Sequence, residues 1–183
     1  GRCVLAGGLD LFLQVHDRGP GGVLLPERHH GLLKLAVDRG EQRAIGPSEI
    51  QQAMRMADRT RQFLDASGAK LALVGRVGSD LSPHGLRYTH AGAVLRDHPA
   101  GPWTFVHLLN ECGADRSGIY DEGLVNFFLD DLFAFEAVVA VPSAAVQQRM
   151  IAALEGPTAT ALHQSAYSLI ANPFSTRYQN SNQ

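Results

Sequence analysis

The chain has little cysteine. Cys3 and Cys112 are the only two among 183 residues, so one disulfide between them is possible but a disulfide framework is excluded. No Cys-x-x-Cys pair occurs, and the sequence therefore predicts no structural zinc site. Nothing in the remaining composition gives a reason to expect a cofactor, so we expect none.

Long hydrophobic runs and an excess of basic residues are also absent. No stretch approaches the roughly 20 consecutive apolar residues that a membrane-spanning helix needs. The formal net charge is -2 and the pI is about 6.5, whereas dedicated nucleic-acid-binding proteins usually carry a basic excess. We therefore expect neither a transmembrane segment nor a nucleic-acid partner.

The composition that remains is that of a folded protein. Hydrophobic residues make up 45% of the chain and charged residues 19%, which suits one ordinary globular domain. Residues 1–44 contain no recognisable site, and we expect them to form a poorly defined N-terminal extension. The chain begins without methionine and ends directly after a motif, so we expect residues 45–183 to be a domain truncated at its C-terminal end.

The hydrophobic pattern of this domain predicts an α+β fold, with an antiparallel sheet of four or more strands and helices packed around it. Apolar runs bounded by glycine and proline predict strands at residues 70–77, 87–96, 103–109 and 135–141. Helical spacing predicts helices at residues 48–67, 124–133 and 143–154, the first with Ser48 as its N-cap. The polar, glycine-bearing stretch 110–123 predicts a surface loop.

Two histidines lie on the second and third predicted strands, which form a β-hairpin. A turn centred between His98 and Pro99 would place His90 directly opposite His107, with Cβ atoms roughly 4.5–5.5 Å apart. A register shifted by two residues would make them diagonal neighbours. Because Gly92 follows His90 on the same strand face, it leaves room for another group to approach.

A pair of touching histidines beside a nucleophile has a clear chemical use. One imidazole takes the proton of the nucleophile, and the other fixes the tautomer and orientation of the first. Two alternatives remain open. The histidines can be packed strand residues without a role, or they can bind zinc together with Glu111 or Asp115.

Other polar residues are candidates for chemistry. Cys112 follows the strand of His107 and is a second candidate nucleophile, although a loop cysteine without a role is the simpler interpretation. The adjacent carboxylates Asp121-Glu122 and Asp130-Asp131 are interpreted as solvated charges rather than as a glycosidase pair.

Residues 87–95 and the triplet Val106-His107-Leu108 resemble the two histidine strands of the permuted NlpC-type papain-like superfamily, which includes the lecithin:retinol acyltransferase-like enzymes. In that group a later Tyr-x-Asn-Cys motif opens a helix, and its cysteine is the nucleophile. The matching stretch here is residues 178–183, hereafter the C-terminal motif, in which Ser181 replaces the cysteine.

This resemblance implies a catalytic site with His90 as the base, His107 as its orienting partner and Ser181 as the nucleophile. Serine lacks the low pKa of a thiol, so it needs a base and an oxyanion hole. The same Ser181 can instead be a simple helix N-cap in an inactive site. Four residues are expected to contact the substrate: Tyr88, Trp103, Tyr178 and Asn180.

A narrower resemblance covers residues from about 45 to 183. The runs 86–92, 120–123, 126–131 and 172–183 resemble an uncharacterised bacterial family, domain of unknown function 2145. Together the two resemblances imply a hydrolase-fold protein with an amidase-, peptidase- or acyltransferase-like site, or an inactive relative of such enzymes. The alternative is a non-catalytic binding module of the bacterial envelope. Either implies a periplasmic or exported location and a peptidoglycan, peptide or lipid-like ligand.

Overall fold

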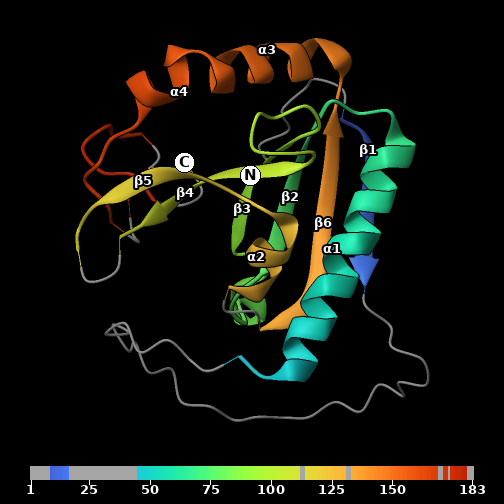
Figure 1. Cartoon of the computed structure of the whole chain (residues 1–183). Coiled ribbons are helices and arrows are strands. Elements are labelled where there is room, and N and C mark those ends of the chain that lie inside the picture. Colours follow the sequence, from blue (N-terminus) through green and yellow to red (C-terminus); the bar gives the residue numbers. More distant parts are fainter. Residues whose placement is uncertain are drawn as a thin grey trace.

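A computed structural model describes residues 9–16, 45–111, 114–130, 133–168, 171–172 and 174–180. The predictions for Cys3, Cys112 and Ser181 concern residues outside these ranges. The fold is α+β, as the sequence predicts, with an antiparallel sheet at its centre (Figure 1).

The sheet has six strands in the order β1-β6-β2-β3-β4-β5, and every neighbouring pair is antiparallel. Figure 1 shows it edge to edge, from β5 at the left to β1 at the right. The strands are β1 (Leu9–His16), β2 (Leu71–Val77), β3 (His90–Leu95), β4 (Thr104–Asn110), β5 (Ser117–Glu122) and β6 (Ala134–Pro142).

The long helix α1 (Pro47–Ser67) confirms the first predicted helix, with one correction. Its N-cap is Gly46 rather than Ser48, because the Glu49 carboxylate accepts a hydrogen bond of 2.8 Å from the Gly46 backbone N–H. The helix ends at Gly68, whose φ of 70° lies in the left-handed region that glycine adopts without strain.

One face of the sheet is covered by α1 and by the short helix α2 (Leu124–Leu129). Alternate strand residues point to this face and pack against the two helices, forming the larger core cluster. Its strand members include Ala72, Val74, Val94, Phe105, Ala137 and Val139.

The opposite face carries α3 (Ala144–Glu155), followed by α4 (Pro157–Leu162), which run across the top of the sheet in Figure 1. A smaller cluster packs there: Leu71, Ala93, Leu95 and Val106 against Met150, Ile151 and Leu154. The connection between β2 and β3 contains a short 3-10 helix, Ser82–His84.

A buried glutamine forms hydrogen bonds that connect α3 to the sheet. The Gln147 side-chain oxygen accepts hydrogen bonds from the backbone N–H groups of Lys70 (2.8 Å) and Leu71 (3.1 Å). Its amide nitrogen donates to the Pro142 carbonyl at 2.7 Å. One side chain thus satisfies polar groups at the start of β2 and the end of β6.

The prediction of a loop over residues 110–123 was wrong, because β5 occupies much of it. Only Ser117 of β5 is buried, so the strand has no apolar face that a hydrophobic pattern could reveal. It is stabilised by its backbone ladder with β4, which runs from Phe105↔Glu122 to Asn110↔Ser117.

Part of the N-terminal segment contributes to the sheet. Strand β1 pairs with β6, from Leu9↔Pro142 to His16↔Glu136, and forms the edge beyond β6. The remainder of residues 1–44 lies outside the described residues.

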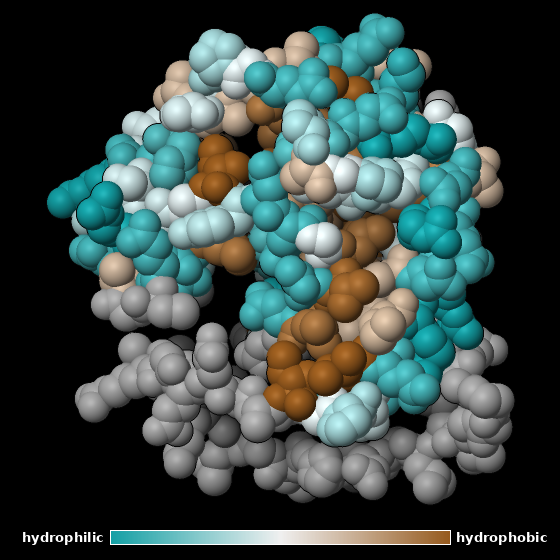
Figure 2. All heavy atoms as spheres, viewed as in Figure 1, coloured by the Kyte–Doolittle hydropathy of each residue, from teal (hydrophilic) through white to brown (hydrophobic). Residues whose placement is uncertain are grey.

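The surface on the α1 side is partly apolar. Ile50 and Met54 of α1 are 40% and 56% exposed. Figure 2, drawn in the same view as Figure 1, shows a band of hydrophobic atoms beside α1, with hydrophilic regions on either side. None of the helices in the described part of the chain has the length and apolar character that crossing a membrane requires.

Candidate functional site

The histidine pair, His90 and His107, lies on adjacent strands in the middle of the sheet. The observed ladder pairs Ala93 with Val106 and Leu95 with Thr104, so the predicted register was wrong by two residues. In the observed register His90 and His107 are diagonal neighbours, and both point to the face that α1 and α2 cover.

The two rings nevertheless touch. His90 Nε2 lies 2.8 Å from His107 Nδ1, which is a hydrogen-bond distance. Gly92 makes this approach possible, because a Cβ atom at that position would lie 2.9 Å from the His107 Cβ and 2.5 Å from Phe105 Cε1. Both histidines are buried, with 8% and 4% of their surface exposed.

Aromatic side chains enclose the pair. Phe127 of α2 packs against both rings, tilted to His90 at a centroid distance of 5.9 Å and edge-on to His107 at 6.1 Å. Phe105 stacks on Phe127 at 3.7 Å and meets His107 edge-on at 5.0 Å. The imidazoles therefore sit in a largely apolar environment that penalises a charged ring.

A buried arginine stands beside His90. Arg76 is its partner on β2, and its guanidinium donates to the Phe127 carbonyl at 2.6 Å and to the Asp130 carboxylate at 2.5 Å. Burial, the Arg76 charge and His107 together lower the pKa of His90 from 6.5 to about 4, against an opposing effect of Asp130. His90 is consequently neutral at neutral pH and can accept a proton.

A carboxylate stands behind the second ring. Glu122 Oε1 lies 2.9 Å from His107 Nε2, at ion-pair distance but without the alignment of a regular hydrogen bond. The His107 side chain is fully buried, and the Glu122 side chain is 20% exposed. Glu122, His107 and His90 thus form a continuous chain of three titratable groups.

Tyr88 lies away from this chain. Its hydroxyl donates to the buried Glu136 carboxylate at 3.1 Å, and Arg87 forms an ion pair with the same carboxylate. The Tyr88 Cβ lies near Gly75 of β2. Because successive strand residues alternate between faces, Gly75 faces the side of the sheet opposite to Arg76. Burial and then the Glu136 charge raise the pKa of Tyr88 to about 12.

Trp103 is a core residue at the end of the β3–β4 turn. It is 2% exposed, and its indole Nε1 donates to the Asp65 carboxylate of α1 at 2.7 Å. The Arg96 guanidinium lies 4.8 Å from the ring centroid. Trp103 joins α1 to the hairpin rather than presenting a free ring to a ligand.

The described part of the C-terminal motif, residues 178–180, is held at the outer edge of the sheet. Residues 165–167 bond to residues 115–117 at the start of β5, as in Ser117 N–H to the Ser165 carbonyl at 2.8 Å. On the outer side of that segment, Gln179 exchanges two backbone hydrogen bonds with Ala166 and Ser168, both 3.0 Å long. With about 4.8 Å between strands, Gln179 lies roughly 19 Å from β3.

Two of the residues expected to contact a substrate belong to this motif. Tyr178 is 39% exposed, and the Arg177 guanidinium lies 5.3 Å from its ring centroid. Asn180 is half-buried. The described residues 174–180 are not helical, and the structure does not bring Tyr178 or Asn180 to the histidine pair.

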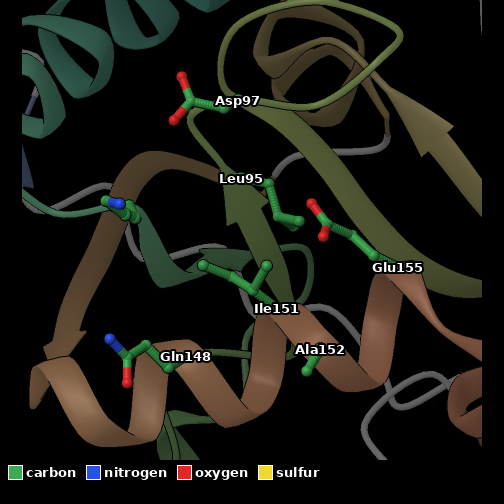
Figure 3. Close-up of a pocket in the computed structure, with 7 residues that line it drawn as sticks. Leu95, Asp97, Gln148, Ile151, Ala152 and Glu155 are labelled. Atoms are coloured by element: carbon green, nitrogen blue, oxygen red, sulfur yellow. The ribbon is translucent and has the colours of Figure 1, made fainter.

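Two surface hollows flank the sheet. A groove of about 660 Å³ between α1, the β3–β4 turn and the β5–α2 connection includes Glu122, Trp103 and Met54 in its wall. A hollow of about 320 Å³ lies on the opposite side, where Figure 3 shows Leu95 of β3 facing Ile151 of α3, with Asp97 and Glu155 around them. Of these two hollows, the groove is the one that reaches the histidine chain, through Glu122.

No group of three or more histidine, cysteine, aspartate or glutamate side chains in the described ranges is arranged to hold a metal ion. The zinc ligands considered from the sequence, Glu111 and Asp115, stand at the far end of the β4–β5 ladder from Glu122. The carboxylate that reaches the histidines is therefore a different one.

Sequence reasoning missed Glu122 and Arg76. The sequence predicts a loop where β5 lies, and a glutamate in a loop is usually solvated, so the prediction for Glu122 was a solvated charge. The only signal was its position one residue before Gly123, at the end of an extended run. Arg76 interrupts an otherwise apolar strand, and a charge in a buried strand indicates a specific partner.

Fold and contacts together define an α+β protein with a buried His-His-Glu chain on one face of an antiparallel sheet. A family described as an uncharacterized protein conserved in bacteria (DUF2145) matches residues 63–183, and the chain belongs to this family. No curated protein and no solved structure matches it.

Proposed function

We propose that this protein has a hydrolase-type site, of amidase, peptidase or acyltransferase chemistry, on a permuted papain-like fold. The observation that carries the proposal is the buried 2.8 Å contact between His90 and His107. A neutral base oriented by a second side chain is the part that a serine or cysteine nucleophile requires.

In this site Ser181 is the nucleophile. Its hydroxyl oxygen attacks the carbonyl carbon of an amide or ester while its proton passes to His90. Collapse of the tetrahedral intermediate expels the amine or alcohol, which takes that proton back. Water, activated by His90, then releases the acid from the acyl-serine, or a second acceptor takes the acyl group.

The position of the C-terminal motif sets a condition on this function. Residues 178–180 are described on the outer side of residues 165–168, several strand spacings from His90. Attack by Ser181 with His90 as its base therefore requires the neighbouring residues 178–180 to leave this edge and approach the histidine face. An activity that depends on both His90 and Ser181 would show that it does.

The test is labelling of the full-length protein by a fluorophosphonate probe. We expect slow labelling at Ser181 that Ser181→Ala abolishes and His90→Gln lowers by at least about 100-fold, the usual contribution of a general base. Asp121→Asn is a matched control on β5 that should label at the normal rate. Absence of labelling, with labelling of Ser181→Cys by a thiol probe, would show a competent fold without native activity.

The burial of both rings favours a second candidate, a non-catalytic binding module of the bacterial envelope. With 8% and 4% exposure, the histidines can serve as a polar brace inside the fold. In that case Ser181→Ala leaves binding of peptidoglycan fragments or lipid vesicles unchanged, and no variant changes a turnover. Loss of turnover on Ser181→Ala would exclude this candidate.

A further inference from the structure

We propose that Glu122 is a positioning residue that fixes the proton pattern of the histidine pair, and that it leaves His90 Nδ1 as the proton-accepting atom. This inference rests on the proposed function for its catalytic meaning. Its structural content, the proton positions, is independent of any turnover.

The argument begins at the carboxylate. Glu122 Oε1 and His107 Nε2 are 2.9 Å apart, and neither atom is accessible to solvent. Two unprotonated acceptor atoms at this distance would repel with no water between them, so one of the two atoms carries a proton, although the contact is not aligned as a regular hydrogen bond. A carboxylate only accepts hydrogen bonds, so with Glu122 as the acceptor the proton belongs to His107 Nε2.

The next link follows from the first. A neutral imidazole carries one N–H, so a proton on Nε2 leaves His107 Nδ1 as an acceptor. The 2.8 Å contact between His107 Nδ1 and His90 Nε2 needs one proton between them, which must therefore be on His90 Nε2. His90 Nδ1 is left with a free lone pair.

The alternative proton positions on the two histidines require a different protonation state of Glu122 or His107. If Glu122 were protonated, or if His107 carried both protons, His107 Nδ1 would donate to His90 Nε2. His90 would then hold its own proton on Nδ1 and could not accept one there. The charge on Glu122 thus decides which nitrogen of His90, two rings away, is basic.

The experiment is ¹⁵N NMR of the histidine rings in the full-length protein at neutral pH. Single His→Gln variants assign the signals. We expect a pyridine-type Nδ1 and a pyrrole-type Nε2 on both His90 and His107. A protonated Nδ1 on His90, or signals averaged between tautomers, would overturn the proposal.

Variants at Glu122 provide the second arm. Glu122→Leu removes the acceptor and should average the tautomers, whereas Glu122→Gln keeps an acceptor oxygen and should restore the wild-type pattern. Asp121→Asn is the matched control, because Asp121 points to the other face, where it lies 3.6 Å from His98. Ring signals in Glu122→Leu identical to those of the wild type would also overturn the proposal.

The experiments distinguish the proposed catalysis from the positioning role of Glu122. If Ser181 is labelled by the probe, Glu122→Leu should slow labelling by roughly tenfold to 100-fold, as loss of a partner behind a functional histidine does. If no variant is labelled but the tautomers are fixed as stated, the proposed catalysis fails and the positioning role of Glu122 stands.

Discussion

At the residue scale, burial and the neighbouring Arg76 charge lower the pKa of His90 from 6.5 to about 4. The unfolded chain therefore binds a proton at this residue between pH 6.5 and 4, while the folded chain does not. By linkage, the free energy of unfolding is unaffected by His90 above pH 6.5. As the pH falls from 6.5 toward 4, proton binding to the unfolded chain lowers that free energy.

The first prediction concerns this pH window. The free energy of unfolding should fall by on the order of 3 kcal/mol between pH 6.5 and 4 because of His90 alone. Urea denaturation at several pH values measures it, and His90→Gln should show a shallower slope in that window. Equal slopes for both proteins would mean that His90 titrates normally in the folded state.

The second prediction concerns Gly92. A methyl group here would lie 2.8 Å from the Val106 carbonyl oxygen and 2.9 Å from the His107 Cβ, which cannot move without displacing β4. Gly92→Ala should cost about 1–3 kcal/mol in urea denaturation and separate the two rings.

Gly118→Ala is the matched control for that variant. Gly118 lies in β5 on the same sheet face, and the three atoms nearest to its added methyl would all belong to the Tyr120 side chain, at 3.0–3.2 Å. Tyr120 is 42% exposed and can turn away, so the control should lose much less stability. Equal losses in the two variants would contradict a special role for the space at Gly92.

At the scale of elements, the Gln147 side chain adds hydrogen bonds to the apolar packing of α3 on the sheet. Gln147→Leu would leave the N–H groups of Lys70 and Leu71 and the Pro142 carbonyl without their partner. We expect a loss of about 1–3 kcal/mol in thermal or urea denaturation, the cost of a buried unpaired group. Gln148→Leu, at the exposed neighbouring position, should change stability by less than about 0.5 kcal/mol.

Elements with a hydrophobic period could be predicted from the sequence, and elements without one could not. Apolar spacing and flanking glycines predict the helix that starts at Pro47 and the strand from Leu71 to Val77. Strand β5 does not, because its stability comes from backbone pairing with β4. A polar edge strand carries the same composition as a loop.

The candidate site divides in the same way. The hairpin was short enough for simple geometry to bring His90 near His107, although the register differed by two residues. Glu122 and Arg76 reach the pair from strands whose pairing with β4 and β3 no local pattern encodes. Side chains joined by tertiary pairing need the fold before they can be recognised.

At the scale of the whole molecule, β1 closes the edge of the sheet beyond β6. Deleting residues 1–44 should expose the backbone of β6 as a free edge, which is a template for pairing with a second copy. We expect lower stability and concentration-dependent association in size-exclusion chromatography, whereas deletion of residues 1–8 alone should preserve the elution profile of the full chain. Unchanged behaviour of the longer deletion would mean that β1 contributes little.

The buried indole of Trp103 is also an intrinsic fluorescent probe of unfolding. It is the single tryptophan in the sequence, and it sits where α1 meets the β3–β4 turn, with Asp65 and Arg96 as neighbours. Intrinsic fluorescence will therefore report one contact only, the docking of α1 on the hairpin. A red shift that precedes the loss of circular dichroism would reveal α1 detaching before the sheet melts, and the two signals together resolve the order of unfolding without any label.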